Sequence, residues 1–174
     1  MSDLFDLTGK VAIVTGSSRG IGRATAEAMA AHGAKVVVSS RKADKCEEVA
    51  EGIKKSGGEA IVIPCHCSHK DQLRNLVDET LATWGRIDSL ICNAAVNPFY
   101  GSLTEIPDEA YDKIMNTNVK SNVWLTSMAI PHMVEVGGGT IVIVSSVAAL
   151  IGSAKLGTYG LSKAADVALA RNIA

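Results

Sequence analysis

A phenol and an ammonium four residues apart form the most chemically suggestive pair in this sequence. Tyr159 and Lys163 belong to the segment Tyr-Gly-Leu-Ser-Lys. Side chains at i and i+4 lie on one face of a helix, so a helix here would bring the two groups together. A nearby ammonium favours the phenolate form of a phenol, which suits tyrosine to give and take a proton near neutral pH. The pair therefore predicts general acid–base chemistry; the alternative is an ordinary exposed helix face.

A serine hydroxyl shortly before this pair is a second candidate. Ser145 and Ser146 follow the apolar run Ile-Val-Ile-Val at positions 141–144. Side chains alternate between the two faces of a sheet, so only one of the two serines can point into the crevice at the carboxyl ends of the strands, where ligands bind. We favour Ser146, whose hydroxyl could donate a hydrogen bond to a developing oxyanion. Ser145 is then a strand residue that faces the other way.

A glycine-rich turn near the start of the chain predicts a phosphate site. The segment Thr-Gly-Ser-Ser-Arg-Gly-Ile-Gly, positions 15–22, lies between the first apolar run and the first helical pattern. Glycine permits a tight turn and a close approach to a pyrophosphate, and a helix N-terminus attracts anions. A glycine triplet in this context favours a dinucleotide site. The alternative is a sharp turn without a ligand.

Basic residues after the second apolar run indicate which dinucleotide would bind. NAD sites usually carry Asp or Glu at this position, to accept hydrogen bonds from the ribose hydroxyls. Here the run ends at Ser40 and Arg41 follows it, without an acid, and Arg19 in the glycine turn adds a second cation. An arginine can pair bidentately with a 2′-phosphate, and a serine can donate to it. We therefore predict NADP; the alternative for Arg41 and Lys42 is a solvated strand end.

The elements that must position these residues alternate between short apolar runs and longer amphipathic stretches. Runs rich in Val and Ile, apolar on both faces, are typical of strands buried in a parallel sheet. They predict strands at Lys10–Thr15, Lys35–Ser40, Glu59–Pro64, Ile87–Asn93 and Thr140–Ser145. The stretches between them predict helices at Gly20–His32, Asp44–Ser56, Lys70–Trp84, Asp108–Val136 and from Thr158 onward, most of them ended by glycine. This alternation predicts one α/β domain of three layers, a doubly wound Rossmann-type parallel sheet of order 3-2-1-4-5.

The composition excludes several classes of function. Seventeen basic and eighteen acidic side chains almost balance, so no strong field attracts nucleic acid or an anionic membrane. No apolar stretch reaches the ~20 residues of a membrane-spanning helix, and the acidic start Met1–Asp6 lacks the layout of a secretory signal. Cys65 and Cys67 have the wrong spacing for a CxxC site, so we expect buried thiols and no metal. We predict a cytoplasmic protein; a peroxisomal address stays open as an alternative.

Taken together, these motifs resemble the short-chain dehydrogenase/reductase family over the whole chain. The TGxxxGIG form of the glycine turn, Asn93-Ala94-Ala95, Asn118, the spacing from Ser146 to Tyr159, and YxxxK occur in the family's order. The resemblance implies that Asn93 steadies the central sheet beside the cofactor, and that Asn118 holds a water linking Lys163 to solvent. It implies catalysis by Asn118, Ser146, Tyr159 and Lys163, and cofactor binding by Gly16, Ser18, Arg19, Gly20, Ile21, Gly22, Ser40, Arg41, Asn93, Ala94, Tyr159 and Lys163.

The segment Asn93–Gly101 resembles the NADPH-dependent carbonyl reductase branch of this family in particular. One departure concerns the third strand, where many relatives place an Asp against adenine and this chain has His66; the imidazole or the backbone alone would serve instead. A second concerns length, because family members carry a further C-terminal portion over the substrate. We therefore expect residues 1–174 to form a single dinucleotide-binding and catalytic domain without that portion.

The predicted activity is NADP(H)-dependent reduction of a neutral, hydrophobic ketone or aldehyde, or the reverse oxidation. Mostly small or apolar residues at positions 96–100 and 147–156 should line the substrate crevice. Two alternatives remain, a dinucleotide-binding sensor of the same fold and an inert truncated fragment. By resemblance, the partners are a small carbonyl or alcohol substrate and further copies of the chain, as a homodimer or homotetramer.

Overall fold

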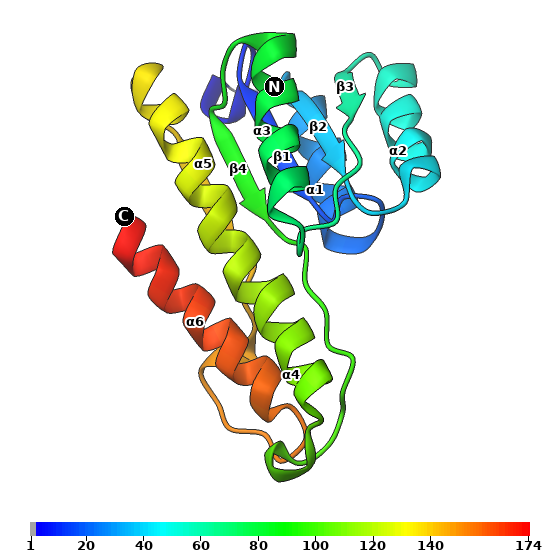
Figure 1. The fold of residues 1–174 in the computed structure, drawn as a ribbon. Helices are drawn as coiled ribbons and strands as arrows, with labels where there is room; N and C mark the ends of the chain where they lie inside the picture. Colours follow the sequence, from blue (N-terminus) through cyan, green and yellow to red (C-terminus); the bar gives the residue numbers. More distant parts are fainter. Residues whose placement is uncertain (1–2) are drawn as a thin grey trace.

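A five-stranded parallel sheet forms the centre of the computed structural model, which describes residues 3–174 (Figure 1). The strand order is β3-β2-β1-β4-β5, as the sequence predicts. The acidic segment Met1–Asp6, which lacks the layout of a secretory signal, falls partly outside the described residues, since these begin at Asp3. The strands are shorter than predicted by one to three residues: β1 Val11–Thr15, β2 Lys35–Ser39, β3 Glu59–Val62, β4 Ser89–Cys92 and β5 Thr140–Ile143.

Helices cover both faces of the sheet and give the predicted three layers. One face carries α1 (Gly20–Ala31) and α2 (Ala43–Lys55), and their apolar residues pack on β-strand side chains such as Val36 and Val38. The other face carries α3 (Lys70–Trp84) and α5 (Ser121–Glu135). Because alternate strand residues point to opposite faces, the apolar runs of the sequence supply both cores.

The glycines that were expected to end helices do so. Gly33, Gly57, Gly85 and Gly137 follow α1, α2, α3 and α5, and each has a positive φ between 71° and 95°. Side chains with a Cβ rarely adopt this left-handed conformation, so glycine ends a helix here at little cost.

The predicted helix Asp108–Val136 is correct in extent but wrong in being continuous. The structure has α4 (Asp108–Met115), a π-helical turn (Asn116–Lys120, the π turn) and then α5. In the π turn the N–H of Ser121 bonds to the carbonyl of Asn116, five residues back. The wider turn accommodates an extra residue and changes which side chains point inward.

The last helix lies beside α5 on the same side of the sheet (Figure 1). It is α6 (Gly157–Ile173), and it follows a short 3-10 helix, Val147–Ala149, at the end of β5. In the part of the chain that the structure describes, β5 pairs only with β4 and is an edge strand. None of the helices described is long and apolar enough to cross a bilayer. All four cysteines are buried free thiols, as expected from their spacing.

A buried carboxylate ties the amino ends of the central strands together. Asp88 precedes β4 and is 6% exposed, and its carboxylate accepts a hydrogen bond from the Val11 N–H at 3.0 Å. The Arg86 guanidinium donates to both oxygens at 2.8 and 2.6 Å, and the Lys10 ammonium lies 3.4 Å away. Burial acts to raise the pKa of Asp88, but the hydrogen bonds from Arg86 and Val11 outweigh it and the pKa is lowered.

We expect Asp88→Ala to lower the free energy of unfolding by about 1–3 kcal/mol at neutral pH, because the buried Val11 N–H loses its acceptor. A carboxyl with a lowered pKa stabilises the fold above its unfolded pKa, and this contribution disappears as pH falls through the folded value. The difference between variant and wild type should therefore shrink in acid. Urea unfolding at neutral and acidic pH measures both effects. Asp78→Ala, on the exposed face of α3, is the matched control; equal losses in the two variants would contradict the assignment.

Candidate active site

The glycine turn adopts a backbone that only glycine accepts easily. Gly16 and Gly20 have φ values of 67° and 56°. A Cβ on Gly22 would lie 2.5 Å from both the Asn93 Nδ2 and the Gly16 carbonyl oxygen. These three glycines therefore serve two needs, a left-handed turn and close packing of α1 against the turn.

Hydrogen bonds hold this turn against the ends of the neighbouring strands. The Asn93 amide donates to the carbonyls of Thr15 and Gly16 at 2.9 and 3.2 Å, and the N–H groups of Asn93 and Ala94 donate to the Thr15 hydroxyl. On the other side, the buried Ser17 hydroxyl donates to the Val14 carbonyl and accepts from the Ser39 N–H. The turn is thus fixed to β4 and β2 at once.

The start of α1 fits a phosphate group. Arg19 is its N-cap, with an extended backbone and no side-chain cap, so side chains leave the first N–H groups of the helix available. Apart from its chain neighbours and the backbone of its own helix, no atom of residues 3–174 lies within 4 Å of the position that a Cβ on Gly20 would take, which leaves open space beside these donors. Ile21 is exposed and Ser18 half-buried at the same end of the helix. The N–H donors, the open space at Gly20 and the positive end of the helix dipole therefore lie together at the start of α1.

Ser40 and Arg41 lie at the carboxyl end of β2, as predicted. Arg41 is exposed, while the Ser40 hydroxyl is 3.1 Å from the Cys46 thiol. His66 follows β3 next to them; burial, the neighbouring His69 and the Arg41 charge all lower its pKa. The neutral His66 ring accepts the Ser68 N–H at Nδ1, 3.3 Å away, which leaves Nε2 as an N–H donor. The resemblance implies an Asp acceptor at this position, and this chain has a donor there.

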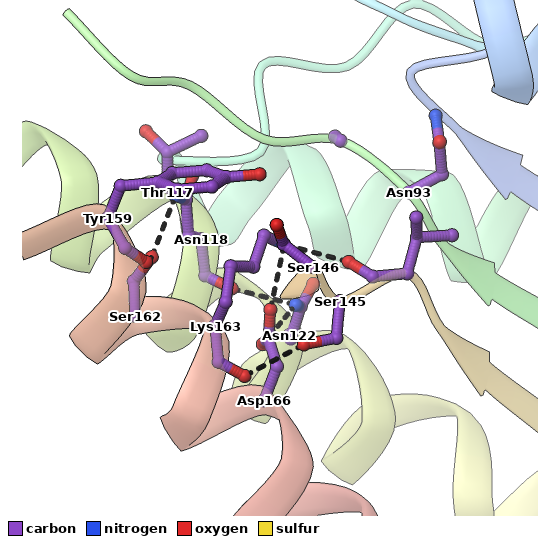
Figure 2. Close-up of polar contacts among 12 residues, drawn as sticks. Asn93, Thr117, Asn118, Asn122, Ser145, Ser146, Tyr159, Ser162, Lys163 and Asp166 are labelled. Carbon is purple, nitrogen blue, oxygen red and sulfur yellow. Dashed lines mark hydrogen bonds and ion pairs between the residues drawn. The ribbon is translucent and has the colours of Figure 1, made fainter. Parts of the chain in front are cut away.

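Ser146 and Tyr159 are brought to the same place by close packing of α6 (Figure 2). A Cβ on Gly160 would lie 2.8 Å from the Ala148 carbonyl oxygen, so glycine allows α6 to approach the turn after β5. The Ser146 oxygen accepts the Ala148 N–H at 3.2 Å, which leaves its hydrogen free to donate. Ser145 instead donates to the Lys163 carbonyl at 2.9 Å. This difference agrees with the choice of Ser146.

Lys163 lies almost completely buried beneath Tyr159, with 2% of its side chain exposed. Its ammonium is 6.0 Å from the centre of the Tyr159 ring, so the helix brings phenol and ammonium together as the spacing predicts. The ammonium donates to the Val144 carbonyl at 2.8 Å and to the Asp166 carboxylate at 2.9 Å. An exposed helix face, the alternative for this pair, is wrong.

Asn118 lies in the π turn and is fully buried, so the alternative of an exposed polar position is wrong. Its side chain accepts the Val96 N–H at 2.8 Å and donates to the Val96 carbonyl and to the Ser162 hydroxyl, each at 3.0 Å. Its own carbonyl accepts a hydrogen bond from the Asn122 amide at 2.7 Å. Asn118 therefore joins the loop after β4 to α6.

Two functional candidates, Asn122 and Asp166, were missed from the sequence. Each has a helical spacing to a residue that was identified, Asn122 four residues after Asn118 and Asp166 three after Lys163. That spacing was the available signal. The π turn itself has no comparable signature, so its place within the long helix could not be inferred.

The loops after β4 and β5 meet at the open side of the site. The Gly101 N–H bonds to the Lys155 carbonyl, and the Lys155 ammonium lies 5.7 Å from the Tyr100 ring centre. Large apolar side chains remain exposed on these loops; they are Tyr100, Leu103, Val147, Leu150 and Ile151. Apart from Leu103, these residues belong to the segments 96–100 and 147–156 that the sequence predicts to line the substrate crevice.

Comparisons with known proteins agree with this geometry. The family model for short chain dehydrogenases matches residues 10–174. The chain is 44% identical over 168 residues to dehydrogenase/reductase SDR family member 4 of Bos taurus, covering 97% of this chain and 60% of that protein. It is 39% identical to tropinone reductase-like 3 of Erythroxylum coca, covering 95% and 64%. The predicted resemblance to the short-chain dehydrogenase/reductase family is thereby confirmed, and the similar proteins include its member 4.

Solved structures share the fold closely. A short-chain type dehydrogenase/reductase from Mycobacterium marinum superimposes with a TM-score of 0.94 at 37% identity, over 100% of this chain and 72% of that one. A 7α-hydroxysteroid dehydrogenase complexed with NADH and 7-oxo glycochenodeoxycholic acid gives 0.93 at 33% identity, over 97% and 66%. The chain spans about 60% of the length of the mammalian relatives it matches. By its sequence motifs, its sheet and its site, the chain belongs to the short-chain dehydrogenase/reductase family.

Proposed function

We propose that the chain is the dinucleotide-binding and catalytic domain of an NADP(H)-dependent oxidoreductase, which reduces a neutral hydrophobic ketone or aldehyde or catalyses the reverse oxidation. The observation that carries this proposal is the buried Lys163 ammonium, which lies 6.0 Å from the centre of the Tyr159 ring. Ser146, after the end of β5, lies at the same place (Figure 2). A structural role alone would not require a phenol, an ammonium and a hydroxyl at one end of the sheet. Acid–base catalysis does.

Each side chain has a definite role in this reaction. The nicotinamide cofactor, when bound, supplies the hydride for the carbonyl carbon in reduction and takes it from the alcohol in oxidation. Tyr159 donates its hydroxyl proton to the carbonyl oxygen in reduction and accepts that proton in oxidation. The Lys163 ammonium stabilises the phenolate that remains, and the free hydrogen of Ser146 stabilises negative charge on the oxygen. Asn118 fixes α6 relative to the loop after β4.

The glycine turn is proposed to hold the phosphates of the cofactor. The uncapped first turn of α1 and the open space at Gly20 support this proposal. Asn93 and Ala94 keep the turn at a fixed distance from β4. The residues proposed to contact the cofactor are those predicted from the sequence: Gly16, Ser18, Arg19, Gly20, Ile21, Gly22, Ser40, Arg41, Asn93, Ala94, Tyr159 and Lys163.

The choice of NADP rests on charge at the end of β2. Arg41 is exposed there with Ser40 beside it, and the first carboxylate after the strand is Asp44, within α2. A 2′-phosphate would meet a guanidinium at this position, whereas an NAD site needs an acceptor for the ribose hydroxyls. The solved 7α-hydroxysteroid dehydrogenase is complexed with NADH, so similarity of fold does not distinguish NADP from NAD. The choice between the two cofactors therefore rests on Arg41.

The apolar loops after β4 and β5 favour a neutral, hydrophobic substrate over a sugar or an acid. Exposed Tyr111 and Val123, on α4 and α5, support the proposed assembly into a homodimer or homotetramer through the α4–α5 helices and α6. Cytoplasmic location remains a prediction from the sequence.

NADPH fluorescence quenching, measured beside an absorbance assay with a hydrophobic diketone, tests the proposal. We expect saturable quenching and oxidation of NADPH that depends on the diketone. Quenching without turnover would instead favour the dinucleotide-binding sensor.

Tyr159→Phe should reduce turnover by about 10²–10⁴-fold, because it removes the proton that the carbonyl oxygen needs. The affinity for NADPH should change less than about threefold, since the ring remains. Steady-state rates and fluorescence titration measure the two quantities separately. Tyr111→Phe, on α4, is the matched control: it removes a phenol hydroxyl away from the site, keeps the ring on the surface proposed for assembly, and should leave both unchanged. Retained turnover in Tyr159→Phe would refute the role of the phenol.

Arg41→Asp should exchange an attractive charge for a repulsive one and change the ratio of kcat/KM for NADPH to that for NADH by about 100-fold, toward NADH. Parallel assays with the two cofactors give this ratio. Arg74→Asp, exposed on α3, makes the same change of charge away from β2 and should leave the ratio as in the wild type. An unchanged ratio in Arg41→Asp would mean that Arg41 is a solvated strand end.

A further inference from the structure

The buried face of α6 is polar, which is unusual for a helix that packs against another helix. Surface helices usually bury an apolar stripe. In α6 the buried side chains are instead Thr158, Ser162, Lys163 and Asp166. Tyr159 is proposed to act from this helix, and the predicted roles already use Lys163. Asp166 has no role in that scheme.

Asp166 is fully buried, and both oxygens of its carboxylate are hydrogen-bonded. One oxygen accepts from the Lys163 ammonium at 2.9 Å, and the other accepts from the Asn122 amide at 2.9 Å. Figure 2 shows the carboxylate between these two groups, below the site formed by Tyr159 and Ser146. A carboxylate in this environment has little freedom to rotate.

The π turn fixes the second partner of this carboxylate. The Asn122 amide divides its two hydrogens between the Asp166 carboxylate and the Asn118 carbonyl. Asn118 is itself bonded to both backbone groups of Val96. The carboxylate is therefore held, through two side chains, to the loop that follows β4.

The first partner is held just as firmly. An ammonium has three N–H donors. Two of those on Lys163 are used by Asp166 and by the Val144 carbonyl at the end of β5. One N–H of the Lys163 ammonium remains, and the two hydrogen bonds to Asp166 and Val144 determine the direction in which it points.

Stability does not account for this arrangement. Replacing a buried ion pair with apolar side chains of similar size is often neutral or stabilising, because burying two charges costs as much as their attraction returns. An apolar residue at position 166 would therefore serve packing as well. The position of the pair beside Tyr159 points to a role in the chemistry.

We propose that Asp166 is a positioning residue for the reaction: its carboxylate, held by Asn122, fixes the direction and the charge of the Lys163 ammonium beneath Tyr159. This inference rests on the proposed function, since it assigns a task within the same site. Asp166 contacts neither substrate nor cofactor and acts only through Lys163.

Few other titratable groups face this pair within residues 3–174. Tyr159 faces it from α6, and the buried Cys92 thiol faces it from β4. Burial raises the pKa of Cys92 far above its usual range, with Cys67 and Asp166 adding to the effect, so this thiol stays neutral. α5 contributes the neutral amide of Asn122, and β5 is followed by the Val144 carbonyl. Asp166 is therefore the negative charge that balances Lys163.

Asp166→Asn removes this charge and keeps the size of the side chain. Loss of a neighbouring negative charge makes every nearby group release its proton more easily. The rise of alcohol oxidation with pH should therefore move to lower pH by about one unit, the effect of one charge over roughly 10 Å at an effective dielectric constant of about 20. Asp78→Asn, exposed on α3, should leave the profile unchanged. A profile for Asp166→Asn that coincides with the wild type would overturn the proposal.

A stability cycle tests the pair without any activity. Lys163→Met and Asp166→Leu each leave one buried charge without a partner, so each should lower the unfolding midpoint. The double variant should recover most of the combined loss. Additive losses would show that the two groups do not hold each other and would overturn the proposal. If the wild type turns over no substrate, the proposed function fails, and this cycle still decides whether Asp166 holds Lys163.

Discussion

The architecture of the site follows from one constraint, the burial of the Lys163 ammonium. A charge that is 2% exposed must find acceptors in the protein, and it finds the Val144 carbonyl and the Asp166 carboxylate. To reach the first, α6 must lie close to the end of β5, which Gly160 permits. To hold the second, α5 must direct Asn122 inward, and α5 begins directly after the π turn. Features scattered over the sequence thus serve one group.

The phosphate end of the site is held differently, because among residues 3–174 no buried charge organises it. Thr15 and Ser17 flank Gly16 and bond with their hydroxyls to neighbouring strands, Thr15 to β4 and Ser17 to β2. At Ser17 the side-chain bond adds to a backbone bond, from the Ser17 N–H to the Ser39 carbonyl at 3.1 Å. The N–H groups at the start of α1 then face an opening with a fixed shape. Such preorganised donors lose little freedom when an anion binds.

The sequence was sufficient for the fold and for the residues that carry motifs. Apolar runs and glycine stops predicted the alternation of strands and helices, and the general rules for doubly wound sheets then supplied the strand order. The spacing of Tyr159 and Lys163 predicted a shared helix face. The π turn could not be predicted, because its backbone differs from an α-helix by a single residue and its sequence permits both. Asp166 escaped notice for a related reason: a carboxylate three residues after a lysine is common on exposed helices, and only burial distinguishes this one.

Poor helix formers concentrate where the long helix contacts α6, and this distribution has a physical explanation. Asn116, Thr117, Asn118, Ser121 and Asn122 all lie within seven consecutive positions. Such residues bond readily to nearby backbone groups and weaken a regular helix. Here that tendency is used, since Ser121 and Asn122 bond to the carbonyls of Thr117 and Asn118. A regular, apolar α5 would pack more simply against α6, but it would offer no donor to Asp166, and the carboxylate would lose the contact that holds it in place beside Lys163.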